Sequence, residues 1–212
     1  MDADLISKIS IFAIPVLMAI AMHEAAHAWA ARYFGDNSLE IQRRITLNPV
    51  PHVDPIGTIL LPLILLWSGS PILFGWAKPV MVSGRAFKNP RHAWRWVAAA
   101  GPIANLIMMV LWAIVLKMSS GLGESATFLV EVGKAGIIIN LVLAVFNLLP
   151  ILPLDGGRIL STLLPTKWAY HYATTERYGM IIVLVLSLTG VLGFIMRPVQ
   201  MLLLDFLNAW IL

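Results

Sequence analysis

Long uncharged apolar stretches, bracketed by charged residues, follow one another along the chain. They cover residues 9–22, 55–77, 96–116, 135–154 and 178–196. Most of them approach or reach the roughly 20 residues that a helix needs to cross about 30 Å of hydrocarbon. The pattern predicts helices at residues 5–34, 91–117, 127–149 and 177–196, with a short apolar segment at 199–212. We therefore expect an all-α polytopic membrane protein, built as a transmembrane helix bundle.

The second apolar stretch, residues 55–77, is long enough to span a membrane but is interrupted by Pro62 and by a Ser-Gly-Ser-Pro run at 68–71. These breaks favour a re-entrant helical hairpin, which enters the membrane and returns on the same side. Residues 39–47 and 77–82 mix β-branched, polar and charged residues in short runs. Such runs predict strands of a small interfacial β-sheet.

The composition also indicates a membrane protein, because hydrophobic residues make up 59% of the chain and charged residues only 12%. The absence of cysteine excludes disulfides, iron–sulfur clusters and thiol catalysis. A formal net charge of +4 would suggest a nucleic-acid partner in a soluble protein, but here the basic residues cluster beside the spans and are interpreted as topology signals. We expect contact with the lipid bilayer and no nucleic acid, and the sequence gives no indication of oligomeric state.

The strongest local motif is His23-Glu24-Ala25-Ala26-His27, an HExxH pattern inside the first predicted helix. Residues four apart lie on the same face of a helix, so both imidazoles can bind one metal ion while Glu24 stays beside it as a base. Three ionisable groups in an apolar helix are costly and usually mark function. The alternative is a pair of hydrogen-bonded interfacial histidines beside a glutamate that reaches toward the membrane surface.

Asp155 is the candidate for a third metal ligand. A catalytic zinc ion takes three protein ligands and keeps one position open for water. Asp155 follows an apolar helix that is broken by Pro150 and Pro153, and two glycines follow it. Irregular backbone at membrane depth is tolerated where it is buried in protein or lines a wet cavity. The alternative is an ordinary turn aspartate at a membrane exit.

The two motifs restrict the topology, because each lies near the trailing end of its apolar stretch and both must reach one ion. Their helices must run in the same direction, which one intervening crossing at residues 96–116 allows. A second full crossing by residues 55–77 would instead place Asp155 on the opposite face from His23 and His27.

This topology predicts which side of the membrane holds the active site. The face with the site would carry 11 of the 15 basic residues, namely Arg32, Arg43, Arg44, Lys78, Arg85, Lys88, Arg91, Arg95, Arg158, Lys167 and Arg177. By the positive-inside rule that face is cytoplasmic, in a multi-pass protein of the cell membrane. The acidic start, Met-Asp-Ala-Asp, would then lie outside, and we expect it to be retained rather than cleaved as part of a signal peptide.

These motifs together resemble the site-2 proteases, a family of intramembrane zinc metallopeptidases that cut membrane-anchored proteins. The resemblance rests on residues 23–27, 48–57, 76–80, 100–105 and 147–158, which read HEAAH, NPVPHVDPIG, WAKPV, AGPIAN and NLLPILPLDGGR. Among the members of the family, the chain looks like the compact form that lacks PDZ or CBS domains. Because no polar segment is long enough to fold separately as a soluble module, we expect residues 1–212 to form a single membrane-embedded metalloprotease domain.

The resemblance also implies roles for individual residues. His23, His27 and Asp155 would bind one Zn2+ ion, and Glu24 would be the catalytic base. Asn147 would lie by the active site and help to hold the substrate backbone.

Two further residues have open interpretations. His52 could donate to the oxyanion or cap the site from the hairpin, and a loop-stabilising histidine is at least as good an interpretation. Gly101, on the intervening helix, could let that helix pack closely against the one that carries the histidines, although small residues are common in any membrane helix.

The function expected from these features is zinc-dependent hydrolysis of peptide bonds within or next to transmembrane segments of membrane-anchored substrates. A helical substrate must unwind before cleavage, and an exposed edge of the predicted sheet could hold the extended segment by strand addition. The chief alternative is a metal-ion transporter or channel. It would need further acidic or histidine-bearing spans along a route across the membrane.

Overall fold

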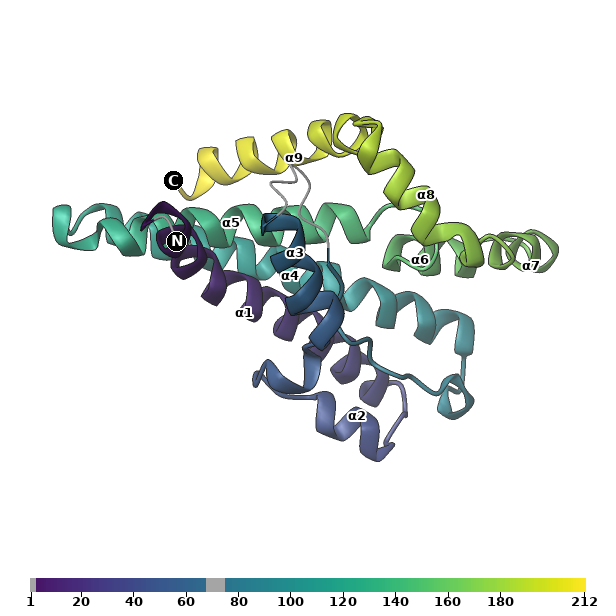
Figure 1. The fold of residues 1–212 in the computed structure, drawn as a ribbon. Coiled ribbons are helices and arrows are strands. Elements are labelled where there is room, and N and C mark those ends of the chain that lie inside the picture. The colour runs from purple at the N-terminus through teal and green to yellow at the C-terminus, as the bar shows by residue number, and fades with distance from the viewer. Residues whose placement is uncertain (1–2, 68–74) are drawn as a thin grey trace.

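The computed structural model describes residues 3–67 and 75–212, and helices dominate both parts (Figure 1). In chain order the α-helices are α1 (Ala3–Tyr33), α2 (Leu39–Arg44), α3 (Leu61–Trp67), α4 (Pro90–Ser120), α5 (Thr127–Asn147), α6 (Asp155–Leu163), α7 (Thr166–Ala173), α8 (Glu176–Leu188) and α9 (Val191–Trp210). Short 3-10 or π-helical turns lie between them: η1 (Val50–His52), η2 (Pro55–Leu60), η3 (Gly84–Ala86) and η4 (Glu124–Ala126).

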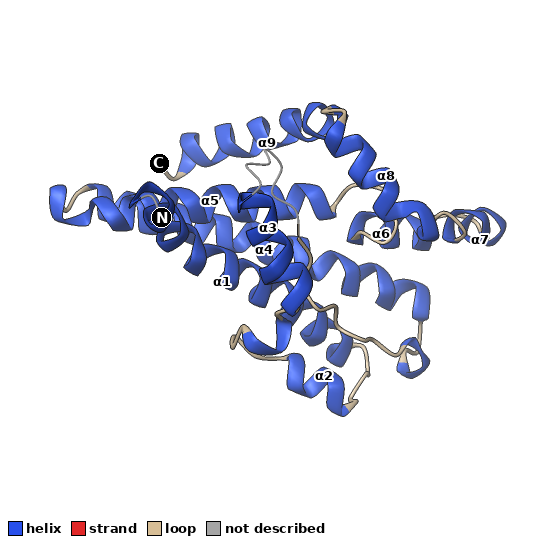
Figure 2. Cartoon of the chain, in the orientation of Figure 1, coloured by secondary structure: helices blue, strands red, loops and turns tan. Residues whose placement is uncertain are grey.

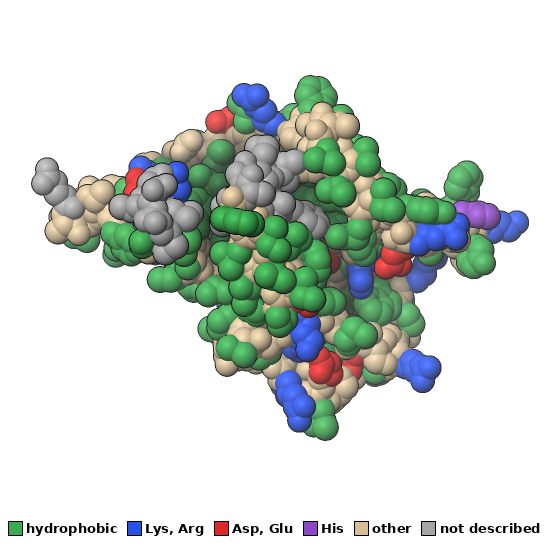
Figure 3. Space-filling view, in the orientation of Figure 1, with side chains coloured by type: hydrophobic (Ala, Val, Ile, Leu, Met, Phe, Trp, Pro, Cys, Tyr) green, Lys and Arg blue, Asp and Glu red, His purple; other side chains and the backbone are tan. Residues whose placement is uncertain are grey.

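Three long helices, α1, α4 and α5, pack against one another at the centre of the molecule, and α9 packs on α5 (Figure 1). The core between them is apolar and includes Met109, Trp112, Leu141 and Leu207. Among the described residues, α1, α4, α5 and α9 are long and apolar enough to cross a membrane. Many large hydrophobic side chains are exposed, and they cover much of the face seen in Figure 3. Such a surface suits contact with lipid, so the fold is that of a transmembrane helix bundle.

The predicted boundaries of the three central helices are confirmed. Asn89 starts α4 by accepting a hydrogen bond from the N–H of His92, and Pro90 occupies the first helical position. Helices α1 and α4 have 31 residues each. At 1.5 Å per residue this is about 46 Å, longer than the roughly 30 Å of the hydrocarbon core. Each of these helices therefore extends beyond the hydrocarbon at one end or both.

The prediction of a small interfacial β-sheet is wrong, because the described residues contain no strand (Figure 2). The first predicted strand, residues 39–47, begins instead with helix α2. Ser38 caps this helix by accepting a hydrogen bond from the N–H of Ile41. Glu40 then pairs with Arg44 one turn later at 3.1 Å, an arrangement that stabilises a helix.

The second predicted strand, residues 77–82, is irregular: the N–H of Lys78 donates to the carbonyl oxygen of His52, and three other backbone groups are bonded to side chains. Arg44 donates to the carbonyl oxygens of Lys78 and Pro79. The N–H of Val80 donates to the carboxylate of Glu24 at 3.2 Å. The sheet edge that was expected to hold a substrate is therefore absent from the described part of the chain.

The segment predicted as a re-entrant hairpin has its two ends side by side. The N–H of Trp76 donates to the carbonyl oxygen of Gly57 at 3.1 Å, and the hydroxyl of Thr58 donates to the carbonyl oxygen of Trp76 at 2.8 Å. Gly57 and Thr58 lie in η2, and the seven-residue helix α3 follows it directly. The predicted break at 68–71 lies outside the described residues.

The predicted end of the helix at residues 177–196 is wrong. The chain forms two helices there, α8 and α9, separated at Gly190, whose φ of 75° lies in the left-handed region that glycine adopts without steric cost. The segment predicted at 199–212 lies mostly inside α9, and so does Pro198. The last helix of membrane-spanning length is therefore α9.

Candidate metal centre

Helix α1 presents His23 and His27 one turn apart on a buried face, with 8% and 9% of their surfaces exposed. Their Nε2 atoms lie 3.0 Å apart. The Nδ1 atom of His23 is 2.6 Å from Oδ1 of Asn105, and that of His27 is 2.7 Å from the carbonyl oxygen of Val97. Both partners are acceptors, so each ring donates from Nδ1, and Nε2 is the nitrogen that a neutral ring offers to a metal ion.

Helix α4 forms one wall of the site along a stripe of residues four apart: Val97, Gly101 and Asn105. Gly101 lies against both rings. A Cβ atom built on it would be 2.5 Å from Nε2 of His27 and 2.6 Å from Nε2 of His23. Only a glycine allows the backbone of α4 to approach the histidine pair this closely.

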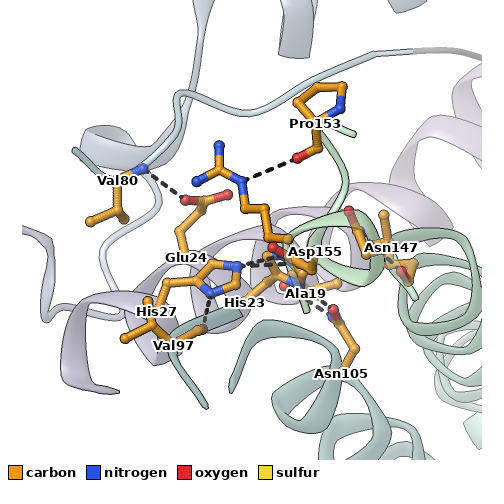
Figure 4. A network of polar contacts seen from close by, with 12 residues as sticks. Ala19, His23, Glu24, His27, Val80, Val97, Asn105, Asn147, Pro153 and Asp155 are labelled. Carbon is orange, nitrogen blue, oxygen red and sulfur yellow. Dashed lines mark hydrogen bonds and ion pairs between the residues drawn. The ribbon is translucent and has the colours of Figure 1, made fainter. Parts of the chain in front are cut away.

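Asp155, the first residue of α6, lies beside the two histidines. After α5 ends, residues 148–154 form a tight turn and α6 begins at Asp155. The turn requires Gly156, because a Cβ atom there would lie 2.1 Å from the carbonyl oxygen of Leu148. The Oδ2 atom of Asp155 is 3.2 Å from Nε2 of His23 and 3.4 Å from Nε2 of His27 (Figure 4).

Three potential metal-ligand atoms thus converge. They are Nε2 of His23, Nε2 of His27 and Oδ2 of Asp155, and this Oδ2 atom is buried without a hydrogen-bond donor. Buried acceptors in such contact are unfavourable unless a cation lies among them. Ligand atoms about 2.05 Å from a tetrahedral zinc ion are roughly 3.3 Å apart. The observed separations of 3.0, 3.2 and 3.4 Å therefore fit zinc.

Glu24 lies beside this cluster rather than in it (Figure 4). Its Oε2 atom accepts the hydrogen bond from Val80 at 3.2 Å. The segment around Val80 is held in turn by Arg44, whose side chain is 3% exposed and also donates to the carbonyl oxygen of Pro51. Glu24 thus lies next to the two histidines without being one of the three clustered residues. A group that transfers protons during the reaction would be needed at this position.

His52 has the contacts of a loop-stabilising residue. It is fully buried, its Nε2 is 3.1 Å from the carbonyl oxygen of Thr46, and its own carbonyl oxygen accepts from the N–H of Lys78. Burial lowers the pKa of the His52 imidazole below its ordinary value of 6.5. These contacts connect two loops and do not include His23, His27 or Asp155, and a role in substrate binding stays a prediction.

Asn147 lies in the last turn of α5, beyond Asp155 in the view of Figure 4. Its amide donates to the carbonyl oxygen of Leu143, one turn earlier in the same helix, at 3.0 Å. The expected role in holding a substrate backbone stays a prediction.

Comparison with known proteins identifies the family. The profile of Peptidase family M50 matches residues 123–190, which include Asn147 and Asp155. Over 190 residues the chain is 41% identical to "Putative zinc metalloprotease YwhC" of Bacillus subtilis, covering 87% of this chain and 83% of that protein. The chain belongs to peptidase family M50, the site-2 proteases.

Other relatives are similar at lower identity. The chain is 30% identical to "Putative zinc metalloprotease Rip2" of Mycolicibacterium smegmatis, over 84% of this chain and 66% of that protein. It is 23% identical to "Zinc metalloprotease MJ0392" of Methanocaldococcus jannaschii, over 84% of this chain and 42% of that protein. No solved structure gives a significant match. With four apolar helices of membrane-spanning length among its described residues, this M50 member is a zinc metalloprotease of the membrane.

The sequence reasoning assigned no role to two residues of this M50 site. Asn105 contacts a candidate ligand directly, and Asn140 contacts Asn105 at 3.0 Å. A signal was present, because each asparagine lies near the middle of a long apolar helix, where an amide is costly without a partner. The backbone partners, at Val97 and Val80, left no signal in the sequence, since any residue carries the same N–H and C=O groups.

Proposed function

We propose that this protein is a zinc-dependent endopeptidase that hydrolyses peptide bonds within or next to transmembrane segments of membrane-anchored proteins. His23, His27 and Asp155 would be the ligands. The observation that carries the proposal is the convergence of their three potential ligand atoms, 3.0 to 3.4 Å apart, in the buried centre of a membrane helix bundle. The printed names of the relatives, which call them zinc metalloproteases, support the same reaction.

The chain's own residues then divide the chemistry between them. Bound zinc supplies Lewis-acid chemistry, which polarises a carbonyl group and acidifies water. Glu24 takes the proton of the attacking water on a carboxylate oxygen and delivers it to the amide nitrogen of the leaving peptide. The hydrogen bond from Val80 holds this carboxylate in place beside the ligand pair.

The site belongs near the cytoplasmic boundary of the membrane. His27 lies six residues before the end of α1 at Tyr33, which is about 9 Å along the helix axis. Arg32, Arg43 and Arg44 follow near the same end of the helix, and the positive-inside rule makes that end cytoplasmic. The segment between Gly57 and Trp76 starts and finishes at one junction, which supports a re-entrant path over a full crossing.

A metal-ion transporter is the other function considered from the sequence, and it would need a series of ligand groups along a route. Within residues 3–67 and 75–212, the cluster of His23, His27 and Asp155 is the group of three or more His, Asp or Glu side chains that lies close enough to hold an ion. A single site with a base next to it suits hydrolysis better than passage.

The proposal is tested with purified parent protein and its Glu24→Gln variant. We expect about one zinc per chain in both by metal analysis, and cleavage of a model single-span substrate by the parent alone. General acid–base catalysis contributes about 10²- to 10⁴-fold, which sets the expected loss of rate. Undiminished cleavage by Glu24→Gln would refute the assigned base. Metal flux into liposomes without proteolysis would favour the transporter.

A further inference from the structure

Two fully buried amides connect His23 to the middle of the helix bundle. They belong to Asn105 on α4 and Asn140 on α5. The amide nitrogen of Asn105 donates to Oδ1 of Asn140 at 3.0 Å and to the carbonyl oxygen of Ala19 at 3.2 Å. The amide nitrogen of Asn140 donates to the carbonyl oxygen of Gly136 at 2.9 Å. With the 2.6 Å contact between His23 and Asn105, these bonds join α1, α4 and α5.

The backbone carbonyl groups of Gly136 and Ala19 fix the direction of every hydrogen bond in this network, because a carbonyl oxygen can only accept. Asn140 must turn its NH2 group to Gly136, which points its oxygen at Asn105. Asn105 must turn its NH2 group to Ala19 and Asn140, which points its own oxygen at His23. The Nδ1 atom of His23 must then carry a proton, and Nε2 is the ring nitrogen that faces Asp155.

We propose that Asn105 and Asn140 are positioning residues for the metal site, which hold His23 in the tautomer and ring orientation that zinc requires. The inference rests on the proposed function, because it takes Nε2 of His23 to be a zinc ligand. The two histidines differ in this respect. His27 is oriented by the backbone carbonyl of Val97, which the fold supplies, whereas His23 depends on side chains that substitution can remove.

A purely structural role for these amides makes a different prediction. Hydrogen bonds between membrane helices hold a bundle together, and their loss would weaken the zinc-free protein without changing how tightly it binds metal. Loss of a positioning partner weakens metal binding itself, by about 10- to 100-fold for groups that orient a metal-bound histidine. Zinc affinity and the thermal midpoint of the zinc-free protein therefore separate the two roles.

The experiment compares three variants of the full chain, purified in detergent. Asn105→Leu removes the acceptor for His23, Asn105→Asp keeps an oxygen there, and Ser119→Ala removes another buried polar group from the same helix, α4. Zinc dissociation constants are measured by competition with a chromophoric chelator, and Co2+ absorption spectra report the coordination geometry. We expect zinc binding about 10- to 100-fold weaker in Asn105→Leu, with an altered Co2+ spectrum, and within about threefold of the parent in the other two.

Parent-like zinc affinity in folded Asn105→Leu would overturn the inference, and so would equal losses in Asn105→Leu and Asn105→Asp. Should Asn105→Leu fail to fold, Asn140→Leu provides the test, because Asn140 acts on His23 only through Asn105. A loss of about three- to tenfold supports the inference, and an unchanged affinity overturns it. If the parent binds zinc but does not cleave the model substrate, the proposed function fails while the affinity comparison stands. A parent that binds no zinc contradicts both.

Discussion

Replacing Gly101 by alanine tests whether metal binding depends on the close approach of α4 to the histidine pair. The added Cβ atom would lie 2.5 Å from Nε2 of His27 and 2.6 Å from Nε2 and Cε1 of His23. Ordinary van der Waals contact begins at 3.4 Å, so the atoms must separate by 0.8 to 0.9 Å. The methyl group would also contact the ring nitrogens that face Asp155.

A displacement of this size is large for a metal site, where ligand distances hold to about ±0.2 Å. Either the imidazoles turn away from the ion, or α4 moves and breaks its hydrogen bonds to them. Overpacking of this kind costs about 1–3 kcal/mol. At about 1.4 kcal/mol for each factor of ten, zinc binding should weaken roughly 5- to 150-fold.

The assay is the zinc dissociation constant of Gly101→Ala, measured by chelator competition together with helical content. Gly193→Ala is the matched control, because Gly193 is also helical and a Cβ atom there meets nothing within 4 Å. We expect the control to bind zinc like the parent. If Gly101→Ala folds and also binds zinc like the parent, the packing of α4 on the imidazoles is not what shapes the site.

Three further outcomes are expected. Removing zinc with a chelator should abolish cleavage and lower the thermal midpoint, and added zinc should restore both, because a ligand that binds only the folded state stabilises it. Arg44→Met should lower the free energy of unfolding by about 2–3 kcal/mol, seen as a lower midpoint, since it removes the buried charged donor that the carbonyl groups of Pro51, Lys78 and Pro79 share. Burial lowers the pKa of His52 from 6.5, so below that pH the unfolded chain binds more protons than the folded chain and stability falls. His52→Gln should flatten this dependence when midpoints are compared at about pH 7.5 and about pH 5.5.

The central helices could be predicted from the sequence because one physical requirement decides them. A chain that crosses hydrocarbon must satisfy its backbone groups within a helix, so long apolar stretches at 9–22, 96–116 and 135–154 leave few alternatives. The same requirement made the metal motifs visible, because ionisable groups at membrane depth need a reason to be there. The direction of α1 and α5 then followed from having to bring His27 and Asp155 to one place.

The interfacial segments could not be predicted in the same way, because their conformation depends on partners that are distant in sequence. Residues 77–82 have the composition of a strand, yet a strand needs a neighbouring strand to satisfy its backbone. Here side chains bond to the backbone instead of a second strand. Arg44 lies 34 residues before Lys78, and Glu24 lies 56 residues before Val80. At Gly190 the conformation of a single residue divided an apolar run that periodicity had treated as continuous.

Helix α4 shows how a helix without a candidate ligand can define a metal site. Its contacts with the histidines come from Val97, Gly101 and Asn105, which lie on one face because they are four residues apart. Val97 contacts His27, Asn105 contacts His23, and Gly101 lies against both. The earlier histidine, His23, contacts the later residue of α4, Asn105, as expected when α1 and α4 run antiparallel. The two histidines on α1 thus meet two acceptors on α4 that lie on one helix face with Gly101 midway between them, and a shift of one residue in α4 would rotate this face away by about 100°.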